Sequence, residues 1–140
     1  MMRGLRVGIA LLAFFQAMMW APALGQQETA ASDTAPFLVV LGVAQDGGTP
    51  QAGTKEHPGW TDPSFRRLAT SLALVDPVNN QRWIFDATPD FREQLHRLDV
   101  IAPSEGKPGL DGILLTHAHM GHYPGLMHLG HESMGASGVP

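Results

Sequence analysis

The sequence contains no cysteine, so neither a disulfide bond nor a thiolate metal site can form within it. Any metal would be held by histidine and carboxylate side chains, which favours zinc, manganese or iron. Basic residues are also scarce, with 9 Lys and Arg against 13 Asp and Glu, and the longest basic run is Arg66-Arg67. Because nucleic-acid binders carry a basic patch, we expect no nucleic-acid partner.

Long apolar runs are absent as well. The longest, VGIALLAFFQAMMW at 7–20, has 14 residues, and about 20 are needed to span a bilayer. Arg3 and Arg6 precede it and the small residues APALG follow, which is typical of a secretion signal. We expect a signal peptide at 1–25 that is cut after Gly25, with a cut after Ala23 or an uncleaved anchor as alternatives. The mature protein would then be exported, periplasmic or secreted, with no membrane contact.

The rest of the chain has the composition of one soluble domain, with 44% apolar and 16% charged residues. Residues 26–36 are small and polar and predict a linker, followed by a domain at 37–140. Its apolar periodicity alternates strands with helices, which indicates the α/β class. The expected strands are 37–43, 71–77, 82–87 and 111–116, the expected helices 88–98 and 124–135, and 138–140 resembles the start of a further strand.

The helix at 88–98 has clear start signals. Thr88 can cap it, Pro89 suits the first helical position, and Asp90 favours the positive end of the helix dipole. Phe91, Leu95 and Leu98 (i, i+4, i+7) form the expected buried stripe.

A long loop at 44–63, dense in Gly and Pro, separates the first two strands. A loop of this length in a compact domain is often functional. Its start, GVAQDGGT at 42–49, comes within one residue of a phosphate-binding loop, but Gly48 stands where that motif has lysine. We therefore expect no nucleotide there.

The strongest chemical signal is the histidine cluster at the end of the strand 111–116. Of 7 histidines, 5 lie between residues 117 and 131. His117 and His119 alternate in extended chain and can converge on one ion, and His122 can turn in from the following helix. We predict a metal site formed by His117, His119 and His122.

Asp86 ends the strand at 82–87. A carboxylate there can accept a hydrogen bond from the second ring nitrogen of a ligand histidine, or hold the histidine loop by its backbone. The remaining histidines have simpler explanations. His128 and His131 are expected on a solvated helix face, His96 on the exposed side of its helix, and His57 in the long loop, where a ligand role stays open.

These residues resemble a known family. ILLTHAHMGH at 113–122 is similar to the His-x-His-x-Asp-His metal signature of the metallo-β-lactamase superfamily, and WIFDA at 83–87 is similar to its upstream strand. LGVAQDGGTPQAG at 41–53, SLALVDP and IFDATPDFREQL resemble the branch that contains pyrroloquinoline-quinone biosynthesis protein B. The resemblance covers 37–140.

The resemblance implies an αββα sandwich built from two similar halves around a metal site at the edge. This chain would supply the N-terminal half and be incomplete at the C-terminus, as a fragment or a truncated product, since the remaining ligands come from the second half. The resemblance makes His117 and His119 ligands of a first metal and His122 of a second. One or two zinc ions are expected, with iron or manganese as alternatives.

Two departures from the family change the expected site. Gly121 stands where the signature has aspartate, so neither that ligand nor the usual general base is present. His122 would turn to the first metal, or a downstream residue would substitute. The segment TKEHPGW at 54–60 has none of the cysteines that relatives often carry there, so no structural zinc is expected.

Three functions remain open. The first is a metal-dependent hydrolase that activates water to cleave an ester, amide or phosphodiester in a small-molecule substrate. The second is an oxidative enzyme of a quinone-cofactor pathway that uses iron. The third is a truncated, inactive remnant that only binds metal, and its uncovered strand edges predict poor solubility.

Overall fold

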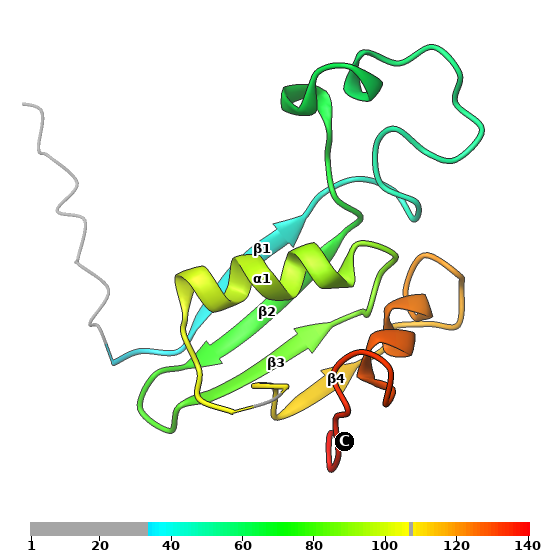
Figure 1. Cartoon of the computed structure of the whole chain (residues 1–140). Helices are drawn as coiled ribbons and strands as arrows, with labels where there is room; N and C mark the ends of the chain where they lie inside the picture. The colour runs from blue at the N-terminus through cyan, green and yellow to red at the C-terminus, as the bar shows by residue number, and fades with distance from the viewer. Residues whose placement is uncertain (1–33, 107) are drawn as a thin grey trace, which may run out of the picture. The chain divides into compact units, whose positions relative to one another are not determined.

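The computed structural model describes residues 34–106 and 108–140, so the expected signal peptide and most of the linker lie outside the described residues. One sheet has the strand order β1-β2-β3-β4 (Figure 1). β1 pairs with β2 and β2 pairs with β3 in antiparallel fashion, whereas β4 lies parallel to β3. The strands are β1 (Phe37–Gly42), β2 (Ser71–Asp76), β3 (Gln81–Phe85) and β4 (Gly112–Leu114). Each expected strand up to residue 116 is present, although the last is only 3 residues long.

Helix α1 (Phe91–Ile101) links β3 to β4 and lies across one face of the sheet (Figure 1). Phe91 and Leu98 of the predicted stripe are fully buried, and Leu95 packs at the edge of the same core. Alternate strand residues such as Leu41, Ala73 and Ile84 meet the helix because side chains on a strand point to opposite faces in turn. This helix-on-sheet layer confirms the α/β class.

The other face of the sheet is apolar too, but less covered. Leu38 is 61% exposed, Val40 62% and Leu114 48%. The strand pairing places Leu38 opposite Leu74 and Val40 opposite Leu72 on the same face of the sheet, and Leu72 and Leu74 are half-buried. Trp83 and Phe85 continue this face on β3. In an αββα sandwich, a face of this kind packs against a second sheet.

The start of α1 differs from the prediction. Asp90, rather than Thr88, occupies the N-cap position, and the first helical residue is Phe91. The Thr88 hydroxyl instead accepts from the Asp90 N–H at 3.1 Å and donates to Gln94 Oε1 at 2.8 Å. Asp90 Oδ2 accepts from the backbone N–H of Ala69 at 2.8 Å. One long-range hydrogen bond, from Ala69 to Asp90, and local bonds of the Thr88 side chain therefore accompany the exclusion of residues 88–90 from the helix.

The segment after the histidines also differs from the prediction. Instead of a helix over 124–135, a shorter 3₁₀ helix, η3, spans Pro124–Leu129. It ends at Gly130, whose backbone is extended (φ −62°, ψ 168°). The described residues contain no strand after β4, so the strand expected at 138–140 is absent from them. Pro140 nevertheless accepts a hydrogen bond from the Ile113 N–H at 3.1 Å, and so lies beside β4.

The long loop between β1 and β2 extends beyond the end of the sheet and carries two short 3₁₀ turns (Figure 1). These are η1 (Pro58–Trp60) and η2 (Pro63–Phe65). Backbone pairs close the loop at its base, since Thr49 and Arg67 exchange hydrogen bonds of 2.7 and 3.0 Å. The loop therefore begins from a fixed stem.

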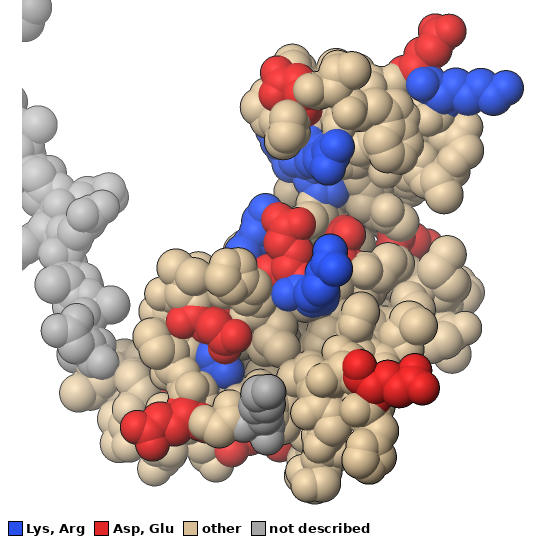
Figure 2. All heavy atoms as spheres, in the orientation of Figure 1, with Lys and Arg blue, Asp and Glu red and all other residues tan. Residues whose placement is uncertain are grey.

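Charges of both signs are interspersed on the described surface shown in Figure 2, without an extended basic patch on that face. Among the described residues, no helix is both long enough and apolar enough to cross a membrane.

Candidate metal centre

Two chain segments meet at one edge of the sheet because β3 and β4 run parallel. Asp86 comes directly after β3, and the segment 115–122 comes directly after β4. Backbone hydrogen bonds join the segments: the Asp86 N–H donates to Leu114 O at 2.9 Å, and the Ala87 N–H to His122 O at 2.8 Å. Functional residues of α/β folds commonly gather at this edge.

The three histidines of the predicted cluster lie together. The ring centroids of His117 and His122 are 3.9 Å apart, and those of His117 and His119 are 4.7 Å apart. His117 Nδ1 lies 3.0 Å from Thr116 Oγ1. That contact occupies Nδ1 and leaves Nε2 to face a ligand.

Asp86 makes both kinds of contact that its position allows. Its Oδ1 accepts from the Thr116 backbone N–H at 2.7 Å, and its Oδ2 lies 2.8 Å from His122 Nδ1. The carboxylate thus holds the histidine loop by its backbone and also orients one ring. Asp86 has a left-handed backbone, with φ 67°, a conformation that aspartate tolerates better than most residues.

The Asp86–His122 contact shifts the pKa of both residues. Burial raises the pKa of Asp86, but hydrogen bonds from Thr116 and His122 outweigh it, so the net pKa lies below the ordinary value. The hydrogen bond to Asp86 raises the pKa of His122 against the opposing effect of its own burial. An ionised carboxylate on one ring nitrogen makes the other nitrogen a stronger electron donor.

Asp46 is a member of the site that the sequence analysis missed. Its Oδ1 lies 3.3 Å from His122 Nε2, on the side of the ring away from Asp86. It belongs to the GVAQDGGT segment at 42–49, which was considered only as a phosphate loop. The sequence did contain one indication that Asp46 belongs to the site, because it is a single carboxylate that follows shortly after the expected strand 37–43.

The chemistry of this donor set suits a divalent ion, since neutral imidazole and carboxylate are ligands of zinc, iron and manganese. The side chains do not yet surround one point: among residues 34–106 and 108–140, no group of three or more His, Asp or Glu is arranged to hold an ion. The rings of His117 and His119 are nearly perpendicular, at 77°. Convergence on an ion would require rotation of these exposed side chains.

The other histidines lie apart from the cluster. His57 Nδ1 accepts from the Gly59 N–H at 2.9 Å and caps η1, which gives it a structural role. His128 lies parallel to the Phe91 ring, with centroids 6.2 Å apart, and is half-buried rather than on a solvated face. His96 and His131 are exposed, as expected.

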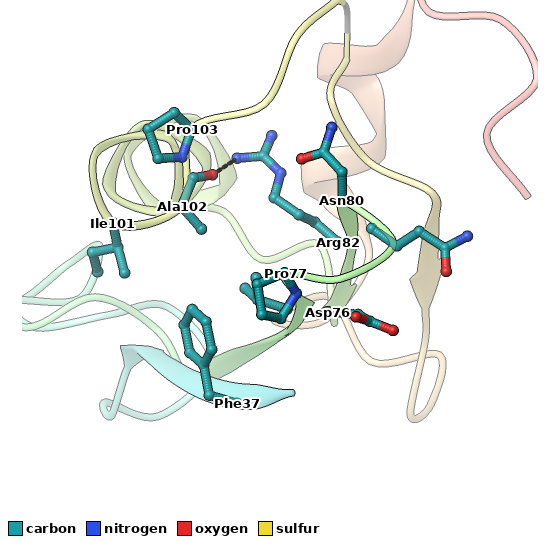
Figure 3. A pocket seen from close by; sticks show the side chains of 10 residues that line it. Phe37, Asp76, Pro77, Asn80, Arg82, Ile101, Ala102 and Pro103 are labelled. Carbon is teal, nitrogen blue, oxygen red and sulfur yellow. Dashed lines mark hydrogen bonds between the residues drawn. The ribbon is translucent and has the colours of Figure 1, made fainter. Parts of the chain in front are cut away.

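Two cavities bear on the location of a ligand. One, of about 420 Å³, adjoins the histidine cluster and is lined by Gln45, Asp46, Gly47, Gln51, Ala52 and Met120. The other, of about 240 Å³, lies at the opposite end of the sheet, near the start of β3 and the end of α1 (Figure 3). Arg82 lies in its wall and donates to the backbone oxygen of Ala102 at 2.6 Å. That contact ties β3 to the end of α1. Arg82 therefore has a structural role and is not free to bind a ligand in this second cavity.

The fold and the histidine loop are similar to those of the metallo-β-lactamase type. Residues 81–139 match the family model described as "Beta-lactamase superfamily domain". The resemblance to that superfamily and the assignment of the fold as an N-terminal portion of it are confirmed.

More particularly, the chain is similar to coenzyme PQQ synthesis protein B. The protein from Xanthomonas axonopodis pv. citri (strain 306) is 32% identical over 98 residues, which cover 64% of this chain and 32% of the relative. The protein from Methylorubrum extorquens (strain PA1) is 30% identical over 98 residues, covering 66% and 33%. The chain thus spans about a third of the length of the curated relatives that it matches.

Two solved structures are also similar to this chain. The zinc-bound PqqB from Methylobacterium extorquens has a TM-score of 0.57 and 28% identity, over 71% of this chain and 35% of that one. A diphosphatase from the PhnP family has a TM-score of 0.52 and 31% identity, over 68% and 34%. The α/β fold and the likeness to the PQQ-related branch are therefore supported by both sequence and structure.

Proposed function

We propose that this chain carries the N-terminal part of a metal-dependent hydrolase site, in which His117, His119 and His122 bind a divalent ion. Zinc is the first candidate, because the similar PqqB structure is zinc-bound. The observation that carries the proposal is the assembly of three imidazole rings at the edge of the sheet, with Asp86 anchored behind one of them.

A divalent ion in such a site supplies Lewis acidity and lowers the pKa of a water ligand to about 7. The residues of this chain position the site. Asp86 engages Nδ1 of His122, so that Nε2 is the nitrogen presented to a ligand. Thr116 fixes the start of the loop through Asp86 and contacts Nδ1 of His117. The neighbouring cavity, which Met120 helps to line, has room for a small substrate.

The substrate class follows from the comparisons rather than from the pocket. One similar structure is a diphosphatase, which favours cleavage of a phosphorus–oxygen bond over cleavage of an amide. We therefore rank phosphodiesters and diphosphates first among small-molecule substrates, with carboxylic esters second.

A second function is favoured by a separate observation. The sequence relatives are coenzyme PQQ synthesis proteins, so an oxidative step on a quinone-cofactor precursor, with iron at the same histidines, is the competing proposal. Oxygen uptake that depends on added Fe(II) and occurs without hydrolysis would favour it.

The test compares metal content and hydrolysis in the purified protein and in His117→Ala. Metal analysis and a phosphodiester assay should show bound zinc and turnover in the unchanged protein and a loss of both in the variant. His96→Ala is the matched control, because His96 is exposed on α1 and outside the cluster. Equal metal content in all three proteins would contradict the proposal, and metal binding without any turnover would support the remnant instead.

We also propose that the protein is exported, on the grounds of the apolar run at 7–20 and the small residues that follow it. N-terminal sequencing of the protein from the producing cells should find a chain that begins near Gln26. A chain that retains Met1 would contradict cleavage.

A further inference from the structure

Position 121 is the main departure from the metal signature, and the structure gives it a physical cause. Gly121 is buried, and a Cβ atom added to it would lie 2.3 Å from Asp46 Cβ and 2.5 Å from Asp46 Cα. Atoms this close overlap, so position 121 cannot carry a side chain while Asp46 stays in place. The lack of a carboxylate at 121 therefore follows from the close packing of the turn that carries Asp46.

The backbone holds Asp46 in a tight turn at the end of the loop stem. The Gly48 N–H donates to Gln45 O at 2.7 Å and closes the turn around Asp46. Gly48 has φ 75°, which favours glycine, and a Cβ there would lie 2.8 Å from Asp90 Oδ2. The Thr49–Arg67 pair then fixes the next residue to the stem. Asp46 thus projects from a defined turn instead of from the open part of the loop.

The direction of the Asp46 carboxylate matches a ligand. Asp86 engages Nδ1 of His122 at 2.8 Å, whereas Asp46 Oδ1 lies 3.3 Å from Nε2, the nitrogen free to coordinate. A charge-assisted N–H···O bond is normally about 2.7–2.9 Å long. Two atoms bound at about 2.0–2.1 Å to one tetrahedral zinc lie roughly 3.3 Å apart. The Asp46–His122 separation is that of a weak direct hydrogen bond and equally matches two ligands of one ion.

The carboxylates of Asp46 and Asp86 also differ in their exposure to solvent. The side chain of Asp86 is 8% exposed and that of Asp46 is 61% exposed. A buried carboxylate on the far side of a ring orients it, and an accessible one beside the cavity can reach an ion and a substrate. Asp46 also lines the cavity next to the cluster.

We propose that Asp46 supplies the carboxylate that Gly121 lacks, as a ligand of the divalent ion held by the histidines. This inference rests on the metal site of the proposed function. The carboxylate reaches the site from the turn after β1, and the loop of 44–70 is thereby coupled to metal binding.

The test measures zinc affinity by calorimetry in the unchanged protein, Asp46→Asn and Glu56→Gln. Asp46→Asn keeps the shape of the side chain but weakens the ligand, so we expect the Kd for zinc to rise at least about tenfold. The absorption spectrum of the Co²⁺-loaded protein should also change, because a ligand is altered. Glu56→Gln removes an exposed carboxylate from the same loop and should leave both readouts unchanged.

A second variant tests the packing at position 121. Gly121→Asp should lower the melting temperature, because the new side chain overlaps both the backbone and the side chain of Asp46.

The outcomes distinguish the two proposals. If the unchanged protein binds no zinc, the proposed metal site fails and this inference fails with it. If zinc binds and His117→Ala abolishes binding while Asp46→Asn binds as tightly as the unchanged protein, only the role of Asp46 is overturned.

Discussion

Asp86 and Thr116 are joined by three short contacts across 30 residues of sequence. Asp86 Oδ1 accepts from the Thr116 backbone N–H at 2.7 Å, and the Thr116 hydroxyl lies 2.9 and 2.8 Å from the two carboxylate oxygens. Since Thr116 directly precedes the first histidine, this junction sets where the histidine loop leaves β4. The same carboxylate also contacts His122.

The first prediction concerns this junction. Asp86→Ala should weaken zinc binding by about 10–100-fold, because His122 loses the group that orients its ring. Calorimetric titration with zinc measures the change. Glu132→Gln, a carboxylate exposed beyond η3, is the control and should bind as the unchanged protein does. Unaltered affinity in Asp86→Ala would show that the ring is oriented by other means.

Much of this junction could be predicted from sequence, and the reason is geometric. A strand that ends in aspartate and a parallel strand that ends in histidines bring their last residues to one edge, so Asp86 and His117 could be paired without coordinates. The position of Asp46 could not be predicted from the sequence, because it depends on the path of a long Gly-rich loop and on the space left by Gly121. The missing carboxylate at 121 was visible in the sequence, but which residue packs against that glycine is a tertiary fact.

The helix boundaries show the same limit. Thr88, Pro89 and Asp90 favour a helix start by local propensity, but Asp90 has a tertiary partner in Ala69. Thr88 bonds to Gln94, whose side chain also donates to Ala69 O. A tertiary hydrogen bond to a buried group outweighs the small local preference. The end was also predicted wrongly, since α1 continues to Ile101 instead of stopping at residue 98. The apolar stripe was predictable because burial determines it.

The second prediction concerns Arg82, which is buried with a side chain 3% exposed. It donates to Gly109 O at 2.7 Å, Ala102 O at 2.6 Å and Asp99 Oδ1 at 2.9 Å (Figure 3 shows the Ala102 bond). Arg82→Met would leave two backbone oxygens without these donors and should lower the free energy of unfolding by about 1–3 kcal/mol. Urea denaturation measures the loss.

The matched control for Arg82, which lies on β3, is Arg97→Met on the surface of α1. Arg97 pairs with Glu93 at 2.8 Å on the surface of α1, with the two side chains 51% and 55% exposed. Screening by solvent limits such a pair to about 0.3–0.5 kcal/mol. Equal losses in the two variants would contradict a structural role for the buried arginine.

The third prediction is a pH dependence at the β2–β3 turn. Asp76 accepts from the side chain of Asn79 at 2.7 Å and from the Val78 N–H at 3.0 Å. The hydrogen bonds from Asn79 lower the pKa of Asp76 below its ordinary value. Because the folded state favours the ionised form, this stabilisation is present above the unfolded pKa of about 3.9 and is lost as the pH falls through the lower folded pKa.

Asp76→Asn measures that contribution. The variant should melt at a lower temperature than the unchanged protein near neutral pH, and the gap should narrow below about pH 4 as Asp76 becomes protonated. Thermal melts at a series of pH values test this. A gap that stays constant down to acid pH would indicate that the charge of Asp76 does not stabilise the turn.

The last prediction concerns the contact between η3 and the start of α1. The Gly125 N–H donates to Ala87 O at 2.9 Å, and a Cβ added to Gly125 would lie 2.4 Å from Phe91 Cβ and 2.5 Å from Thr88 O. Gly125→Ala should therefore push η3 away from the core and cost about 1–3 kcal/mol of stability. Urea denaturation measures that cost.

Gly130→Ala is the comparison for this contact, because its φ of −62° suits any residue and its added Cβ meets a single atom, Met127 O at 3.3 Å, which needs only a small shift of that neighbour. It should cost clearly less stability than Gly125→Ala. Because Ala87 also binds His122 through the backbone, displacement of η3 should also raise the Kd for zinc in Gly125→Ala. A destabilised Gly125→Ala protein with unchanged zinc affinity would show that the histidine loop is held by Asp86 alone and not by the packing of η3.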